Sequence, residues 1–273
     1  MIEIMKQAAL AAAQIQMKYF RQSGLEISDK TSHNDLLTIA DVESQRAIKE
    51  YIVRELASQK NIQESDIGFI GEEDLHSVGT HTFIIDPIDG TANYATGNEE
   101  FCTLIGYEYQ GELQAGVMYF PVNDWMYQVE KGKGVTVTKR GVSQNLSLVK
   151  NDLHKSFLYT SLSYPDDIEA GLDMRIPAFQ KEFRGIRLIG CAGSELGLIA
   201  EGTAGVSVLV GCSIWDLAPG KLILDELGYG MYDWSGNEVT FDLDSPKKKY
   251  PFFACHPDFK EKMVALLHET KHD

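Results

Sequence analysis

Acidic side chains that directly follow short apolar runs constrain this chain more than any other feature of its sequence. Glu72 and Glu73 come just after Phe69-Ile70, and Asp86 follows the run 83–85. A charged side chain beside a buried strand costs free energy unless it is paired or binds a metal. Several carboxylates in one place would repel one another unless cations lay among them. Oxygen ligands select Mg²⁺, Mn²⁺ or Ca²⁺ rather than zinc, so the pattern predicts a site for hard divalent cations.

Three further acids fit the same pattern. They are Asp41 after the run 36–40, Asp89 within D-P-I-D-G-T, and Asp216 a short loop after the buried run 206–210. Taken singly, each is explained by local structure, because Asp41 and Asp216 suit helix caps and Asp89-Gly90 is a common turn pair. Their joint occurrence favours a functional cluster.

The hexapeptide D-P-I-D-G-T excludes several other metal- and phosphate-binding motifs. An EF-hand loop that started at Asp86 would have Ile88 at position 3 and Gly97 at position 12, where the motif requires oxygen ligands. The segment is therefore not an EF-hand. The aspartyl-phosphate phosphatases carry D-x-D-G-T, and the one extra residue here would misplace a carboxylate. The sequence contains neither a G-x-x-x-x-G-K-[ST] loop nor a G-x-S-x-G elbow.

The rest of the pattern indicates a mixed α and β fold. Apolar residues at helical spacing predict a helix over 4–19, and Gly24 is the stop signal that follows it. A second helix is predicted with Asp41 as its N-cap. A strand over 82–85 should end near Asp86, because Pro87 cannot donate to a ladder. Turn residues within 101–138 indicate an antiparallel meander. After residue 145 the pattern alternates, with strands at 157–161, 186–189, 206–210 and 252–255 and helices at 168–183, 193–200, 216–227 and 257–270.

Charge and cysteine content narrow the class of protein. The 273 residues carry 40 acidic and 25 basic side chains, and the net charge of −15 argues against partners such as nucleic acid or an anionic membrane. The four cysteines at 102, 191, 212 and 255 are widely scattered, with a spacing that suits neither a zinc site nor a disulfide framework. We therefore expect a cytoplasmic protein with no membrane and no nucleic acid as partner.

Five motifs in chain order resemble those of the inositol monophosphatase family of metal-dependent, lithium-sensitive phosphomonoesterases. They are Lys30 with D-L-L-T-I-A-D (35–41), G-E-E (71–73), I-I-D-P-I-D-G-T-A-N-Y (84–94), G-C-A-G (190–193) and W-D-L-A (215–218). The resemblance implies an α+β, mixed α/β fold, the five-layer αβαβα sandwich of the inositol monophosphatase and fructose-1,6-bisphosphatase type, and a homodimer. We expect an α+β subdomain over 1–145 with most metal ligands, and an α/β subdomain over 146–273 that supplies Asp216 and the substrate pocket.

The resemblance also implies a role for each matched residue. The metal ligands would be Glu72, Asp86, the carbonyl of Ile88, Asp89 and Asp216, with Asp86 bridging two ions. The catalytic groups that position and activate water would be Glu72 and Thr91, supported by Asp41. The phosphate would bind the backbone N–H groups of Gly90 and Thr91 at a helix start. The substrate would contact Asp89, Gly190, Cys191, Ala192 and Asp216.

The implied chemistry is hydrolysis by a metal-activated water without a covalent phosphoenzyme. Two or three Mg²⁺ ions would neutralise the phosphate and the carboxylates, lower the pKa of a bound water and stabilise the leaving alkoxide. Mn²⁺ is the expected substitute, and Li⁺ and Ca²⁺ are expected inhibitors. The expected partner is a small-molecule phosphomonoester, an inositol monophosphate-like sugar or polyol phosphate.

The substrate stays open because the chain departs from the family at the pocket. Leu209 aligns with a glutamate that binds inositol hydroxyls, and a leucine cannot accept those hydrogen bonds. Gly197 stands where the branch that hydrolyses nucleotide 3′,5′-bisphosphates has a lysine, and Glu195 suits the N-terminal dipole of its helix. The alternatives are the same chemistry on a nucleotide 3′,5′-bisphosphate, NADP, fructose 1,6-bisphosphate or histidinol phosphate, or a non-catalytic regulatory family member.

Overall fold

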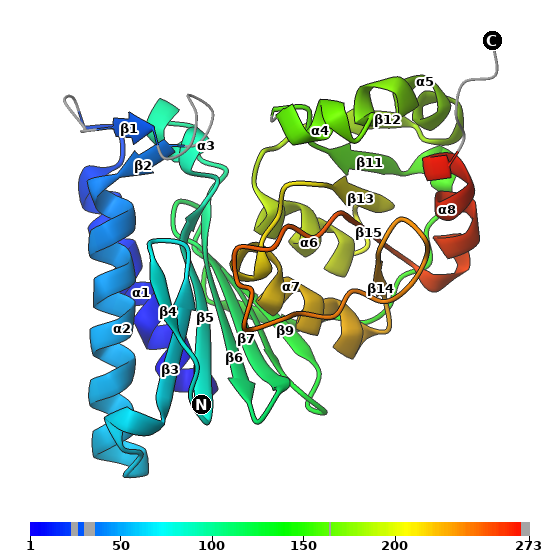
Figure 1. Ribbon diagram of the computed structural model, residues 1–273. Coiled ribbons are helices and arrows are strands. Elements are labelled where there is room, and N and C mark those ends of the chain that lie inside the picture. Colours follow the sequence, from blue (N-terminus) through cyan, green and yellow to red (C-terminus); the bar gives the residue numbers. More distant parts are fainter. Residues whose placement is uncertain (23–26, 30–35, 164, 269–273) are drawn as a thin grey trace.

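The computed structural model describes residues 1–22, 27–29, 36–163 and 165–268. Five layers follow one another in the order helices, sheet, helices, sheet, helices (Figure 1), which confirms the expected αβαβα sandwich. The outer helices on one side are α1 (Ile2–Tyr19) and α2 (Ile39–Lys60), those between the sheets are α6 (Ala192–Ala200) and α7 (Ile214–Leu227), and those on the far side are α4 (Pro165–Glu169), α5 (Leu172–Glu182) and α8 (Lys260–His268).

The first sheet has eight strands in the order β10-β9-β8-β7-β6-β5-β3-β4. Its strands β6 to β9 form the antiparallel meander that the turn residues predict, and β3 pairs with β5 in parallel. The strands are β3 (Ile67–Gly71), β4 (Leu75–Ser77), β5 (His81–Asp89), β6 (Cys102–Tyr109), β7 (Glu112–Phe120), β8 (Trp125–Glu130), β9 (Val135–Lys139) and β10 (Val142–Asn145). A separate two-stranded pair, β1 (Ile27–Asp29) and β2 (Leu36–Thr38), precedes α2.

The second sheet has five strands in the order β12-β11-β13-β15-β14. The strands are β11 (Phe157–Thr160), β12 (Gly185–Arg187), β13 (Val206–Leu209), β14 (Gly230–Tyr232) and β15 (Phe252–Cys255). The sheet is parallel on the β11 side and antiparallel on the β15 side. Strand β14 is absent from the sequence prediction, because three residues are too few for a periodic signal. Short 3-10 helices occupy Glu64–Asp66, Leu153–Lys155 and Pro257–Phe259.

Apolar clusters fill the spaces between all five layers. Ile52 of α2 and Phe83 of β5 belong to the cluster under the outer helices. Leu196 of α6 and Ile223 of α7 belong to a cluster that reaches both sheets, and Phe253 belongs to a third under α5 and α8. Full burial of such a side chain contributes about 1.5–3 kcal/mol. The middle layer of helices is therefore packed against both sheets.

Strand β5 runs three residues further than the sequence predicts. The expected end near Asp86 is wrong, since β5 continues to Asp89. The register between β5 and β6 shifts between these two aspartates, and this irregularity contains Pro87, whose missing N–H therefore breaks no regular ladder. The Pro87 carbonyl accepts hydrogen bonds from Gln16 Nε2 at 2.8 Å and Thr103 Oγ1 at 3.0 Å. The bulge thus sets the spacing of Asp86 and Asp89.

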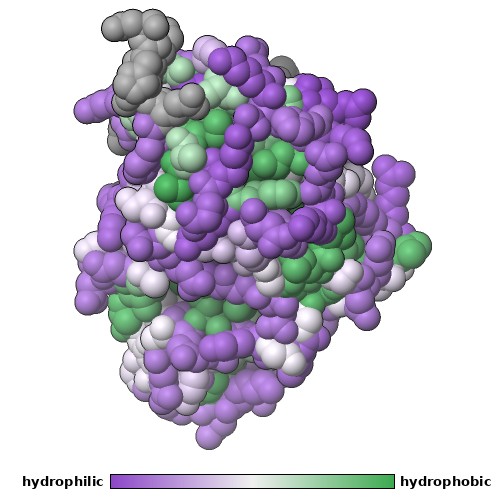
Figure 2. All heavy atoms as spheres, turned by 90° about the vertical axis from the view of Figure 1, so that its right-hand side faces the viewer, coloured by the Kyte–Doolittle hydropathy of each residue, from purple (hydrophilic) through white to green (hydrophobic). Residues whose placement is uncertain are grey.

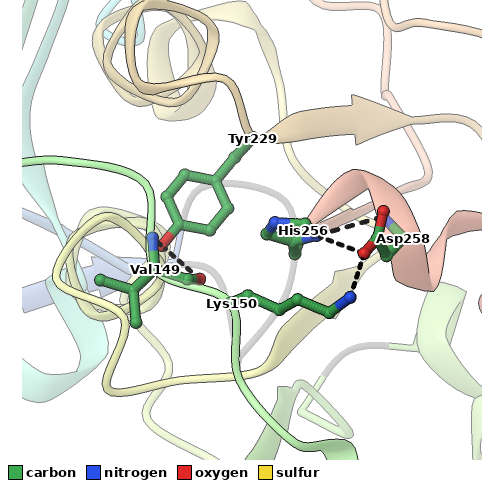
Figure 3. Close-up of polar contacts among 5 residues, drawn as sticks. All are labelled: Val149, Lys150, Tyr229, His256 and Asp258. Atoms are coloured by element: carbon green, nitrogen blue, oxygen red, sulfur yellow. Dashed lines mark hydrogen bonds and ion pairs between the residues drawn. The ribbon is translucent and has the colours of Figure 1, made fainter.

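The segment 146–156, which connects the two sheets, is held by side chains of the second half of the chain. Figure 3 shows the Tyr229 hydroxyl at the backbone of Val149, where it accepts the N–H at 3.0 Å and donates to the carbonyl at 3.1 Å. Lys150, the next residue, forms an ion pair with Asp258, which lies beside His256. Among the helices of the described residues, none combines the length and the apolar character needed to cross a bilayer.

Candidate active site

Two expected metal ligands occupy equivalent places on neighbouring parallel strands. Gly71 ends β3 and pairs with Ile85 of β5, so Glu72 and Asp86 are the next residues at the same edge of the sheet. Asp86 is buried, and its Oδ1 accepts the N–H of Ile88 at 3.0 Å. Glu72 is half-buried. The parallel register therefore brings together two acids that are 14 positions apart in the printed sequence.

Asp41 connects the start of α2 to the D-P-I-D-G-T segment. The prediction that Asp41 is the N-cap is wrong, because α2 begins at Ile39 and Thr38 is its N-cap. Asp41 is the third helical residue, and its Oδ2 accepts the N–H of Thr38 at 2.8 Å and the hydroxyl at 2.6 Å. Its Oδ1 lies 3.4 Å from the hydroxyl oxygen of Thr91, which also lies 2.9 Å from the carbonyl of Ile88. The fully buried Asp41 carboxylate thus serves both segments.

Gly90 allows two of the motifs to touch. It is the N-cap of α3 (Thr91–Thr96) and has a φ of 87°, a conformation that favours glycine. A Cβ at this position would lie 2.8 Å from the Glu100 carbonyl and 3.3 Å from both Cys191 Cβ and the Gly190 carbonyl. The D-P-I-D-G-T turn therefore lies directly against the G-C-A-G segment.

The Asp89 carboxylate lies at the N-terminus of α6. Its Oδ1 accepts the N–H of Ala192 at 3.1 Å, and its Oδ2 accepts the N–H of Gly193 at 2.6 Å and the thiol of Cys191 at 3.1 Å. Burial, together with the charge of Asp216, raises the pKa of Asp89 to about 6. The helix N–H groups oppose this rise because they stabilise the charged form.

Asp216 repeats the arrangement seen at Asp41. Helix α7 begins at Ile214 rather than at the expected residue 216, and Ser213 is its N-cap. Asp216 is again the third helical residue, and its Oδ2 accepts the N–H of Ser213 at 2.5 Å. Because its charge contributes to the raised pKa of Asp89, the two carboxylates repel each other across the site.

The structure brings the expected residues together in pairs rather than in one tight group. Among the described residues, no three of Glu72, Asp86, Asp89 and Asp216 have ligand oxygens that all lie within 4.8 Å of one another. The pairs are Glu72 with Asp86 by strand register, Asp41 with Thr91 by a hydrogen bond, and Asp89 with Asp216 by charge. Lys30 and Asp35 of the first motif lie outside the described residues.

Leu209 and Glu195, two residues considered for the substrate pocket, are both buried in the fold. Leu209 is buried in the cluster between the sheets, so it offers no acceptor to a substrate hydroxyl. Glu195 is fully buried, its Oε2 accepts the Ser207 hydroxyl at 2.7 Å, and its Oε1 has no hydrogen-bond partner in the described part of the chain. Burial raises the pKa of Glu195 to about 8, so the helix dipole does not keep this side chain charged at neutral pH.

Sequence reasoning missed the contributions of Gly193 and Cys102. A Cβ at Gly193 would lie 2.5 Å from Cys102 Sγ and 3.1 Å from Asp89 Oδ2. A glycine in the first turn of a helix was the available signal for this close approach. No local signal marks Cys102, which lies 89 positions from its neighbour Cys191.

Known proteins are similar to this chain over most of its length. The profile of the inositol monophosphatase family matches residues 1–272. The fructose-1,6-bisphosphatase/inositol-1-monophosphatase of Thermotoga maritima is 30% identical over 217 residues, which cover 78% of this chain and 77% of that protein. Inositol monophosphatase 1 of Homo sapiens is 31% identical over 221 residues, which cover 79% of this chain and 76% of that protein.

A solved structure agrees with these sequence matches. The crystal structure of the extragenic suppressor protein suhB from Bartonella henselae has a TM-score of 0.82 at 26% identity and covers 98% of both chains. Sequence motifs, layer order and the full-length match all agree. The chain therefore belongs to the inositol monophosphatase family and is a phosphatase of the phosphoric monoester hydrolase class.

Proposed function

We propose that this phosphatase hydrolyses a small phosphomonoester, a sugar or polyol phosphate of the inositol monophosphate type, by Mg²⁺-dependent attack of water. The observation that carries the proposal is the pair Asp89 and Asp216. Each carboxylate accepts hydrogen bonds from a helix N-terminus, and the charge of Asp216 raises the pKa of the buried Asp89. A cation beside both carboxylates relieves that repulsion.

The donor set of the site fits a hard divalent cation. The residues that would hold it offer only oxygen: the carboxylates of Glu72, Asp86, Asp89 and Asp216 and the carbonyl of Ile88. Two or three Mg²⁺ ions, when bound, supply a water of lowered pKa and positive charge at the phosphate and the leaving oxygen. We propose Mn²⁺ as the substitute and Li⁺ and Ca²⁺ as inhibitors.

Thr91 and Glu72 are proposed to orient the attacking water. When the Thr91 hydroxyl donates to Asp41, its oxygen lone pairs remain available to accept a hydrogen bond from the attacking water. Glu72 lies at the sheet edge beside Asp86, where its carboxylate can accept the one proton that the water loses as it attacks. Asp41 acts as a positioning residue, since its other oxygen is held by Thr38.

The substrate side of the proposal rests on the contact between two motifs. The backbone N–H groups of Gly90 and Thr91, at the start of α3, would bind the phosphate, which is the role that the family resemblance implies for them. The alcohol would face Gly190, Cys191 and Ala192, next to the metal-bound carboxylates. The buried Leu209 favours a substrate whose recognition needs no carboxylate at that position. Nucleotide 3′,5′-bisphosphates, NADP, fructose 1,6-bisphosphate and histidinol phosphate are the alternatives to compare.

We further propose a cytoplasmic homodimer whose protomers have one subdomain over 1–145 and another over 146–273. The face in Figure 2 shows apolar patches between hydrophilic side chains. Exposed apolar side chains of the second half include Ile168, Met174 and Leu188. The proposal of a homodimer rests on the resemblance to the family, and these side chains are candidates for the contact. Sedimentation velocity measures the oligomeric state, and a monomer at micromolar concentration would contradict the dimer.

Phosphate release from a panel of phosphomonoesters, with and without Mg²⁺, tests the activity. We expect Mg²⁺-dependent turnover, and Asp89→Asn should lower kcat/KM by at least about 100-fold, because it removes a negative charge from the ion site. The matched control is Asp173→Asn, which changes an exposed aspartate and should leave kcat/KM within about twofold. Full activity of Asp89→Asn, or turnover independent of divalent cations, would contradict the proposal.

A further inference from the structure

We propose that Asp89, Cys102 and Cys191 form a second cation site, specific for a thiophilic divalent ion such as Zn²⁺. Asp89 ends β5, Cys102 begins β6, and Cys191 is the N-cap of α6. All three side chains are buried, and their ligand atoms lie within 4.8 Å of one another. Two thiols and a carboxylate, contributed by three separate elements, therefore share one point in the fold.

The spacing of the two sulfurs matches that of a tetrahedral zinc site, and the carboxylate oxygen lies close enough to both to share the ion. The sulfurs of Cys102 and Cys191 lie 3.8 Å apart, and Asp89 Oδ2 lies 3.6 Å from the first and 3.1 Å from the second. With Zn–S bonds of about 2.3 Å, tetrahedral geometry separates two sulfurs by about 3.8 Å. A single point can lie about 2.3 Å from both sulfurs and about 2.0 Å from the oxygen.

The surroundings hold these donors in place. The N–H groups of Ala192 and Gly193 orient the Asp89 carboxylate, as hydrogen bonds to ligating carboxylates do in metal sites. Only a glycine fits at position 193, because a Cβ would lie 2.5 Å from Cys102 Sγ. The Ser194 hydroxyl lies 3.2 Å from Cys191 Sγ and offers a fourth donor. Gly190, which precedes Cys191, is exposed, so the site lies one residue from the surface of the chain.

The donor set separates this site chemically from the oxygen site. Thiolates prefer Zn²⁺ to Mg²⁺, and binding releases both thiol protons to water. Asp89 is common to the two sites, so its coordination at the thiolate site competes with its use at the Mg²⁺ site. Thiophilic ions should therefore inhibit the phosphatase. This consequence rests on the proposed function, whereas the binding itself does not.

Cadmium titration tests the binding without any assay of activity. The full-length protein is first reduced and then freed of reductant under argon, and a thiol titration confirms four free thiols. Cd²⁺ is then added while the ultraviolet charge-transfer band from thiolate to cadmium is recorded. We expect the band to saturate at one Cd²⁺ per chain. Cys102→Ser and Cys191→Ser should each reduce the affinity at least tenfold. The buried Cys255→Ser on β15 is the matched control and should keep the band unchanged.

Two further measurements separate the loss of a metal ligand from a loss of folding. Cys102→Ala and Cys191→Ala replace each thiol by a small apolar side chain, so that weaker binding is measured on a folded protein verified by circular dichroism. Half-inhibition of phosphate release by Zn²⁺ should require at least ten times more Zn²⁺ in Cys102→Ser than in the parent chain. No band in the parent chain, or an unchanged band in both folded alanine variants, overturns the site. A normal band in a chain without phosphatase activity instead contradicts the proposed function alone.

Discussion

The hydroxyl oxygen of Thr91 lies 3.4 Å from Asp41 Oδ1, although 50 positions separate the two residues in the chain. The other oxygen of Asp41 accepts the N–H and the hydroxyl of Thr38 at the start of α2. One buried carboxylate therefore has two partners, one in a helix cap and one in the candidate catalytic segment. Substitutions can separate these roles, since the two oxygens face different residues.

Asp41→Asn should lower kcat about 100-fold, because the amide has only one oxygen and cannot accept hydrogen bonds from both Thr38 and Thr91. The lost cap should also reduce the free energy of unfolding by about 1 kcal/mol. Thr38→Ala removes a cap partner alone, so it should cost a similar amount of stability while kcat stays within about threefold. Steady-state kinetics and urea unfolding measure both effects. Equal kcat losses in the two variants would show that Asp41 acts only through the helix.

Thr91→Val should lower kcat about 100-fold with little change in volume, because it removes the hydroxyl that lies near Asp41 and Ile88. Thr91→Ser keeps the hydroxyl and should retain kcat within about tenfold of the parent value. Both are measured as kcat for phosphate release at saturating Mg²⁺. If valine and serine reduce kcat alike, the methyl group rather than the hydroxyl matters at this position.

Gly90→Ala should destabilise the protein more than a strained φ alone explains. Gly90 and Gly111 have nearly the same φ, 87° and 88°, but a Cβ at Gly111 meets nothing within 4 Å. At Gly90 it lies 2.8 Å from the Glu100 carbonyl. We expect Gly111→Ala to reduce the free energy of unfolding by about 1 kcal/mol and Gly90→Ala by about 3 kcal/mol. Urea unfolding measures both, and equal losses would mean that the contact between the two motifs relaxes freely.

Glu195→Gln should make the protein more stable than the parent chain at alkaline pH. The pKa of Glu195 is raised from its ordinary 4.5 to about 8 in the folded protein, chiefly by burial. A carboxyl with a raised folded pKa stabilises the fold fully below its unfolded pKa and loses this contribution as the pH rises to about 8. The parent chain should therefore lose on the order of a few kcal/mol relative to Glu195→Gln between these limits.

Melting temperatures at pH 5, 7 and 9 check this prediction. The difference between Glu195→Gln and the parent chain should grow with pH and level off above about pH 8. Glu169→Gln changes an exposed glutamate of α4 and serves as the control, with a difference that stays near zero. A pH-independent difference for Glu195→Gln would show that this side chain has the same pKa in both states.

The local sequence was sufficient for most elements because their signals lie within a few residues. Periodic apolar residues predicted α1, turn residues predicted the meander of β6 to β9, and the motifs predicted the five layers through the family resemblance. The errors fell at element ends. The N-cap of α2 lies three residues before Asp41, and α7 begins two residues before Asp216, since a capping box and a single cap share the same residue types. Strand β5 continues past its predicted end near Asp86, because the irregularity around Pro87 depends on the partner strand β6 and has no local signal.

The chemical groups of the site are already present in the linear sequence: the carboxylates, the hydroxyl of Thr91 and the glycines at 90 and 193. Which of these groups meet depends on the folded arrangement of strands and helices. Parallel register places Glu72 beside Asp86, and the start of α6 receives Asp89 together with Cys102 and Cys191. The physical reason is that burial and strand pairing join residues far apart in the chain. A scattered set of cysteines therefore carries no local sign that two of them lie 3.8 Å apart.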